Sequence, residues 1–225
     1  MSQNIIIKIC AGIMAVSGIV IVFSTVYPIL SYEWEASQKY PILISSLVDK
    51  ETADFKFSKD STKLSNWFED KKPNDFVTQK VGFFTLSVPK LKIDNATVAV
   101  GTEDLSQYLV LYPGTALPGK TGNSVVFGHS ILPQYFDPTN YSSIFSTLYE
   151  LKTGDEIVTN YDGVTYRYRV YDMFEVKPTE LDVLNQTSSG SYISLITCSP
   201  PGHPLKPRRL VVRAKLVPTS QAMIN

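Results

Sequence analysis

One thiol stands at the end of a predicted strand, in a position that suits a nucleophile. Cys198 closes the run Ile193-Ser-Leu-Ile-Thr-Cys, just before a proline-rich loop. The only other cysteine, Cys10, lies in an apolar N-terminal stretch, so no intradomain disulfide is expected. Cys198 is therefore either a buried core residue or a working thiol, and a working thiol needs a proton partner such as an imidazole.

His129 is the better of the two histidines for that task. It closes the run Ser124-Val-Val-Phe-Gly-His, which ends a second predicted strand. His203 is closer to Cys198 in sequence, but it lies in a loop between a glycine and a proline. We therefore expect His129 to act as general acid and base. The alternative is a histidine that only packs at a strand end.

Two arginines open the last predicted strand. Leu210 and Ala214 would share its core-facing side, which places Arg209 on the outer side. If this strand lies beside that of Cys198, the Arg209 guanidinium could stabilise an oxyanion or orient a substrate carbonyl. Arg208 would point inward and is the weaker candidate. The alternative for either residue is an ordinary surface arginine at a strand end.

The N-terminus predicts a membrane anchor. Residues 9–30 contain no charge and would measure roughly 33 Å as a helix, enough to cross the hydrocarbon core of a bilayer. Lys8 precedes this run, and Glu33 and Glu35 follow it, so we expect residues 1–8 to be cytoplasmic and the bulk of the chain to lie outside the cytoplasm. A cleaved signal peptide is the alternative, but the run is long for one and no A-x-A-like site follows.

The anchor leads into a segment of mixed character at residues 31–80. Its second half is dense in Lys, Asp, Glu and Ser, with Trp67 and Phe68 between them. We interpret it as a stalk or lead-in that serves either as a spacer or as an inhibitory lid.

The sequence pattern of residues 81–217 is typical of a β domain. Short runs alternate apolar and polar residues and are separated by turn pairs such as Asp162-Gly163. We count eight or nine such runs, and the spacing of Ile144, Leu148 and Leu151 predicts one helix, with Gly154 as its stop. This pattern favours a closed barrel or a sandwich. Residues 218–225 would be a tail.

Composition excludes several functions. The 225 residues include 21 basic and 21 acidic ones, so no bulk charge favours nucleic acid. The segment at residues 114–121 matches the P-loop pattern, but a β run follows it where a P-loop needs a helix. Two histidines and one accessible cysteine give no zinc-ligand cluster. We expect no metal and no cofactor.

The motifs, taken in order, resemble those of sortases. His129 in Phe-Gly-His-Ser, the pair Thr197-Cys198, and Arg209 in Arg-Leu-Val-Val match the His, Thr-Cys and Arg motifs of that family. The resemblance covers about residues 82–217. It implies a mainly β fold, a sortase-like closed β-barrel of about eight strands with one or two short helices, behind the transmembrane helix.

The same resemblance implies an activity. A sortase cuts an LPXTG-like sorting signal through a cysteine thioester and passes the acyl group to an amine. Cys198 would then be the nucleophile, His129 the general acid and base, Arg209 the group that positions substrate and stabilises the oxyanion, and Thr197 a substrate contact. Partners would be sorting-signal-bearing surface proteins or pilins, an amine from peptidoglycan or a pilin lysine, and membrane lipid.

Two other functions fit the same residues. A hydrolytic cysteine peptidase would pass the acyl group to water. A non-catalytic membrane-anchored β-barrel interaction module would keep Cys198 as inert core. The proline-rich loop after Cys198 departs from familiar sortases, so the recognised pentapeptide stays open.

Overall fold

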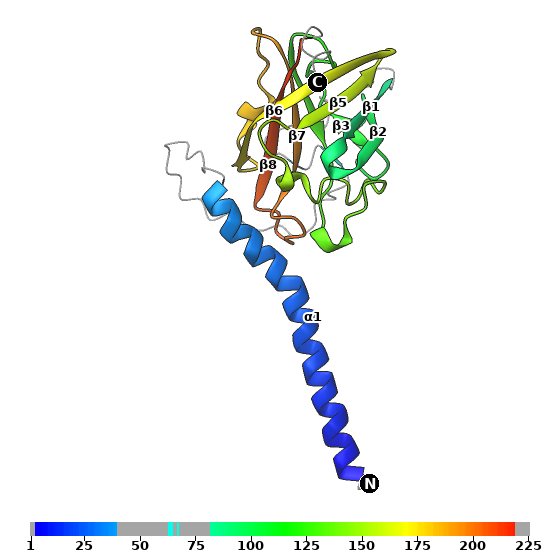
Figure 1. Cartoon of the computed structure of the whole chain (residues 1–225), viewed down its shortest axis with the longest axis vertical. Helices are drawn as coiled ribbons and strands as arrows, with labels where there is room; N and C mark the ends of the chain where they lie inside the picture. Colours follow the sequence, from blue (N-terminus) through cyan, green and yellow to red (C-terminus); the bar gives the residue numbers. More distant parts are fainter. Residues whose placement is uncertain (1–2, 40–62, 65–66, 68–81, 219–225) are drawn as a thin grey trace.

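A long helix leads into a β-barrel in this computed structural model, which describes residues 3–39, 63–64, 67 and 82–218 (Figure 1). The helix, α1 (Gln3–Lys39), has 37 residues and is therefore roughly 55 Å long. It contains a span that is long and apolar enough to cross a membrane, which is compatible with a single-pass anchor. Residues 31–39, assigned above to the lead-in, continue this helix and carry it roughly 13 Å beyond Leu30.

Most of the predicted lead-in falls outside the described residues, as do Phe68 and nearly all of the predicted C-terminal tail. Of the lead-in beyond α1, the structure describes Lys63, Leu64 and Trp67.

Eight strands close into one barrel, as the sequence predicted. Their order around the barrel is β1-β2-β3-β4-β7-β8-β6-β5, and β5 pairs with β1 to complete the ring. Most neighbouring pairs are antiparallel, while β2 with β3 and β4 with β7 are parallel. The strands are β1 (Gly82–Val88), β2 (Ile93–Val100), β3 (Leu109–Leu111), β4 (Gly122–Phe127), β5 (Glu156–Tyr161), β6 (Val164–Val176), β7 (Ser191–Ser199) and β8 (Arg208–Leu216).

Side chains on β7 and β8 alternate between the inside and the outside of the barrel. Ile193, Leu195 and Leu210 belong to the apolar cluster that fills the interior. Ile196 and Val211 belong to a second cluster on the outer face. Because a strand has a period of two residues, Cys198 and Arg209 lie on the outer face, whereas Ser199 and Arg208 lie on the inner one.

The helix expected around residues 144–151 is a series of turns that ends in a 3-10 helix, η5 (Leu148–Glu150). The backbone bonds there join residues three apart, for example from Leu148 N to Phe145 O. Ile144, Leu148 and Leu151 are nevertheless buried, so their spacing reports a shared core face. Three further 3-10 helices are described, η3 (Pro89–Leu91), η4 (Pro133–Tyr135) and η6 (Leu181–Leu184).

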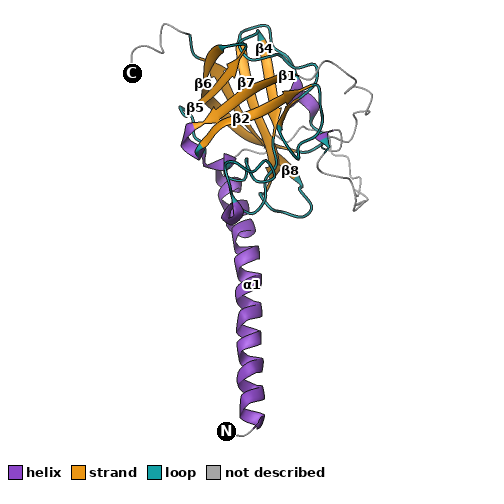
Figure 2. Cartoon of the chain, turned by 90° about the vertical axis from the view of Figure 1, so that its right-hand side faces the viewer, coloured by secondary structure: helices purple, strands orange, loops and turns teal. Residues whose placement is uncertain are grey.

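The C-terminal turns of α1 meet one end of the barrel (Figures 1 and 2). Tyr32 and Ala36 are buried there and belong to the interior apolar cluster. The Tyr32 ring packs edge-on against Tyr149, with ring centroids 5.2 Å apart. The helix therefore joins the core of the barrel by direct side-chain packing.

Candidate active site

Pairing between β7 and β8 sets Cys198 directly opposite Arg209. The two strands are antiparallel neighbours, and Cys198 and Arg209 are register partners near the β7 end and the β8 start. Both are buried, with 3% and 6% of their surface exposed. Paired residues on neighbouring strands project from the same face of a sheet. The arginine on the outer face thus lies beside the thiol.

His129 is brought to the same place by the parallel pairing of β4 with β7. The residues on both sides of His129 are tied to β7, because Gly128 N donates a hydrogen bond to Ile196 O at 3.2 Å and Ser130 Oγ donates to Cys198 O at 2.8 Å. These two bonds fasten the backbone that carries the imidazole to the backbone that carries the thiol.

Thr197 faces the inside of the barrel and helps with this fastening. The residue is 1% exposed, and its hydroxyl donates to Gly128 O at 2.8 Å. In this conformation the hydroxyl is committed to the backbone next to His129. A substrate contact by Thr197 stays a prediction.

Trp67 covers the site, and sequence reasoning did not single it out. Its indole lies 5.6 Å from the His129 ring and 5.3 Å from the Arg209 Cζ, measured to the centroid of the indole ring. Trp67 also belongs to the outer apolar cluster that includes Cys198, and only 2% of its surface is exposed. One side chain thus contacts the surroundings of all three predicted catalytic residues.

The backbone of Trp67 is hydrogen-bonded to Arg209 and to Leu64. Arg209 Nη2 donates to Trp67 O at 3.0 Å. Leu64, which is fully buried, donates from its N to Glu103 O at 3.0 Å, and its own carbonyl accepts a bond from Trp67 N. The sequence signal for this cover was a pair of large apolar side chains inside a charged segment.

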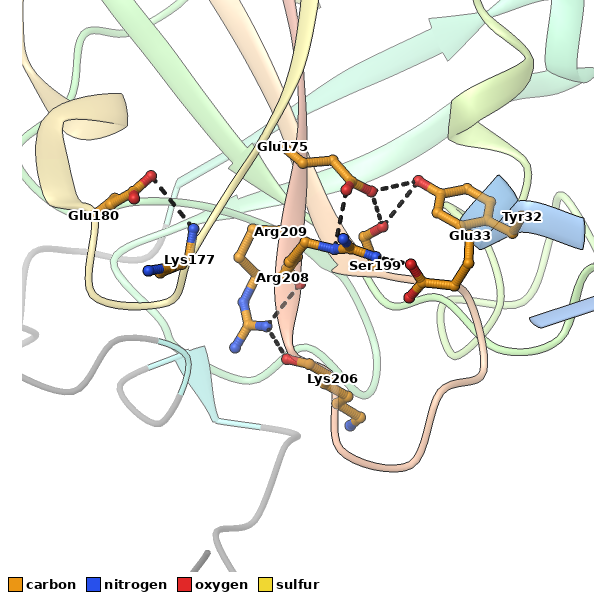
Figure 3. Close-up of polar contacts among 9 residues, drawn as sticks. All are labelled: Tyr32, Glu33, Glu175, Lys177, Glu180, Ser199, Lys206, Arg208 and Arg209. Atoms are coloured by element: carbon orange, nitrogen blue, oxygen red, sulfur yellow. Dashed lines mark hydrogen bonds and ion pairs between the residues drawn. The ribbon is translucent and has the colours of Figure 1, made fainter. Parts of the chain in front are cut away.

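The Arg209 guanidinium is held by carbonyl oxygens. Besides Trp67 O, it donates to Lys206 O at 2.9 Å and Arg208 O at 3.0 Å (Figure 3). Among the described residues, Arg209 forms no ion pair with a carboxylate. Its orientation is therefore fixed while its positive charge is not neutralised by a carboxylate, which suits a group that receives negative charge during a reaction.

His203 lies within the loop between β7 and β8. Its Nδ1 accepts a hydrogen bond from Leu205 N at 3.1 Å, and its backbone N donates to Pro200 O. These contacts join the loop to itself, whereas the contacts around His129 join it to β7. The structure thus ties the neighbours of His129 to the strand that carries Cys198, and the choice of His129 as the proton partner stays a prediction.

The segment that matches the P-loop pattern runs through turns directly into β4, with no helix after it. Within the described ranges, no three His, Cys, Asp or Glu side chains are grouped to hold a metal ion.

Comparisons with known proteins agree with this architecture. A family model described as the Sortase domain matches residues 86–217, which is more than half of the chain. The chain is similar to sortase C-1 from Actinomyces oris at 30% identity, covering 60% of this chain and 73% of that one with a TM-score of 0.52. A lid mutant of sortase A from Corynebacterium diphtheriae gives 29% identity, coverages of 62% and 73%, and a TM-score of 0.53.

The pilus-related sortase C of Group B Streptococcus is similar to a comparable degree, with 29% identity, coverages of 64% and 70%, and a TM-score of 0.52. A comparison with curated proteins gives no match.

Replacing Trp67 by alanine should open the site. The change removes a large buried side chain, worth about 2 kcal/mol of burial, and so should favour the uncovered state on the order of thirtyfold. We expect alkylation of Cys198 by iodoacetamide to accelerate by that order in a Cys10→Ser background. Trp34→Ala is the matched control, because Trp34 is 70% exposed on α1. Equal rates for the Trp67→Ala and Trp34→Ala proteins would show that Trp67 does not shield the thiol.

Replacing Gly128 by alanine should displace the backbone that carries His129. A Cβ there would lie 2.5 Å from a Phe145 ring carbon and 2.6 Å from a Leu109 methyl. Such overpacking costs about 1–3 kcal/mol of the free energy of unfolding, measurable by chemical denaturation. Gly82→Ala is the control, since its Cβ would meet nothing closer than 3.9 Å. Equal stability of the Gly128→Ala and Gly82→Ala proteins would contradict the tight packing of Phe145 and Leu109 against Gly128.

Proposed function

The chain belongs to the sortase family, and we propose that it is a membrane-anchored cysteine transpeptidase that cleaves an LPXTG-like sorting signal. The observation that carries this proposal is the register pair of Cys198 and Arg209 on the outer face of the barrel, with the backbone of His129 tied beside it. A thiol, an imidazole and a fixed cation gathered on one surface are the parts that acyl transfer requires.

The reaction divides into two acyl transfers. The Cys198 thiolate attacks the scissile carbonyl carbon, the C–N bond breaks, and His129 gives a proton to the leaving amine. This leaves a thioester on Cys198. An incoming amine then attacks the thioester carbonyl, His129 takes a proton from that amine, and the C–S bond breaks to release the new amide and regenerate the Cys198 thiolate.

Arg209 is assigned to the oxygen of the reacting carbonyl. That oxygen gains negative charge in each tetrahedral intermediate, and a guanidinium already held by three backbone carbonyls needs little reorganisation to stabilise it. When Trp67 moves away, the Nη2 that donates to its carbonyl becomes free to donate to the substrate.

The outer apolar cluster is assigned as the site for the apolar side chains of the signal. In the described structure, Leu64 and Trp67 belong to this cluster together with Val110 and Ile196, and Trp67 packs edge-on against Phe127. The side chains of Leu64 and Trp67 occupy the space next to Cys198 that a substrate needs, so they act as a lid. The existence of a lid in the related sortase A from Corynebacterium diphtheriae supports this assignment.

The partners follow from the same role. The acyl donor would be a sorting-signal-bearing surface protein or pilin, and the acceptor an amine of peptidoglycan or of a pilin lysine. Similarity to the pilus-related sortase C of Group B Streptococcus supports a pilin as one donor. We place the barrel outside the cytoplasm, because Lys8 precedes the apolar part of α1 and acidic residues follow it.

Two alternatives remain distinct from this proposal. The burial of Cys198 under Trp67 is the observation that favours an interaction module with an inert thiol. A hydrolytic peptidase would use the same residues and differ only in the acceptor.

Replacing Cys198 by alanine should abolish acyl transfer without unfolding the protein. We expect intact mass spectrometry of the full-length chain, incubated with LPXTG-like peptides and triglycine, to detect a thioester and an amine-capped product that both vanish in Cys198→Ala. Cys10→Ala should retain them. Melting temperatures should agree within a few degrees, because the change removes one small sulfur atom.

The products separate the alternatives. A cleaved peptide without an amine-capped form would identify a hydrolase. A Cys198→Ala protein that does not fold, together with a wild type that forms no adduct, would favour the interaction module in which Cys198 is an inert core residue.

Protease treatment of intact cells should test the orientation. We expect external proteinase to degrade the barrel while an N-terminal epitope tag survives, because the tag precedes the membrane span. Degradation of both parts in lysed cells is the control. A barrel that is protected in intact cells would contradict the orientation.

A further inference from the structure

A polar network joins the end of α1 to the barrel next to the catalytic strands (Figure 3). The Tyr32 hydroxyl donates to Glu175 Oε1 at 2.8 Å and accepts from Ser199 Oγ at 2.8 Å. Ser199 Oγ also contacts the same oxygen of Glu175, so its single proton can bond to Tyr32 or to Glu175. Glu175 lies on β6 and is 3% exposed. A buried carboxylate of this kind needs such partners, because an unsatisfied one is costly.

Arg208 extends the network to a second residue of α1. Its Nη2 donates to Glu33 Oε2 at 2.5 Å, and its Nε lies 3.0 Å from Glu175 Oε2 as an ion pair. Burial by itself lowers the pKa of Arg208, but the hydrogen bond with Glu33 and the charge of Glu175 raise it overall. Arg208 is therefore a fixed cation between a carboxylate of the barrel and a carboxylate of the anchor.

The residues held by this network are immediate neighbours of the proposed catalytic ones. Ser199 pairs with Arg208 in the β7–β8 register, one step beyond the pair formed by Cys198 and Arg209. Successive residues of a strand point to opposite faces. The helix thus holds the inner pair, Ser199 and Arg208. Each of these residues is joined by one peptide bond to a member of the outer pair, which points to the proposed substrate side.

We propose that the end of α1 is a positioning element of the active site, in which Tyr32 and Glu33 hold Ser199 and Arg208 and so fix the direction of Cys198 and Arg209. This inference rests on the proposed function of Cys198 and Arg209. Tyr32 and Glu33 are positioning residues, because they contact the inner pair and not the reacting atoms. The membrane helix then has a second task besides anchoring, which is to keep the β7 end and the β8 start in their reactive arrangement.

The test uses the full-length chain in detergent micelles, in a Cys10→Ser background. Tyr32→Phe removes one hydroxyl and Glu33→Gln removes one charge. Glu35→Gln is the matched control, because Glu35 is an exposed residue of the same helix that pairs with Lys39. We measure kcat and KM for peptide and amine, the rate of Cys198 alkylation by iodoacetamide, and the melting temperature.

We expect Tyr32→Phe and Glu33→Gln each to lower kcat about tenfold while KM changes less than twofold, since the binding surface is intact and the reacting groups are misaligned. Cys198 alkylation should accelerate at least threefold, because the β7 end is held less firmly. Glu35→Gln should change neither quantity more than twofold. A lower kcat together with faster alkylation of Cys198 distinguishes misalignment of the reacting groups from loss of the nucleophile.

A kcat that is unchanged in both the Tyr32→Phe and the Glu33→Gln protein would overturn the proposal. If Glu33→Gln does not fold, Tyr32→Phe decides alone, since it removes a single oxygen atom. If the wild type processes no peptide, the proposed function fails, and the alkylation rates, which need no substrate, still judge the positioning. If Cys198 in the Tyr32→Phe and Glu33→Gln proteins is alkylated at the same rate as in Glu35→Gln, the positioning proposal is overturned.

Discussion

The antiparallel register of β7 with β8 is the constraint on which the rest of the site depends. It makes two adjacent pairs, Cys198 with Arg209 and Ser199 with Arg208, and the twofold period of a strand sends them to opposite faces. A shift of one residue would bury the thiol in the barrel and expose its supporting serine. The pairing of β7 with β8 therefore places the proposed reacting residues on the outer face and the residues that hold them on the inner face.

The N-terminal part of the chain contacts both of these faces. On the outer face the Trp67 ring lies near His129 and Arg209, and in the proposed mechanism it moves away before a substrate reaches the thiol. At the end of the barrel, Tyr32 belongs to the interior core and bonds to the inner serine. The first contact restrains access and the second restrains geometry. In the proposed account, Trp67 and Tyr32 thus act on the site in two different ways.

Local patterns predicted most of the strands, and the resemblance to sortases, not the alternation alone, predicted that they close into a barrel. Alternation along the last strand predicted that Arg209 faces outward. The resemblance to sortase motifs also predicted that His129, Cys198 and Arg209 lie together. Sequence reasoning missed Trp67, Glu175 and Tyr32, since their partners lie far along the chain and no local period reveals such contacts. It expected a helix around Leu148, where apolar residues three or four apart share a core face through turns.

The central claim is that one outer surface binds substrate between Cys198, His129 and Arg209, in place of Trp67. The most direct measurement is an experimental structure of the full-length protein with a sorting-signal peptide bound covalently to Cys198. The account predicts that His129 and Arg209 contact the bound peptide, that Trp67 has left its position, and that Tyr32 still bonds to Ser199. A bound peptide that lies beside an undisplaced Trp67, out of reach of Arg209, would contradict it.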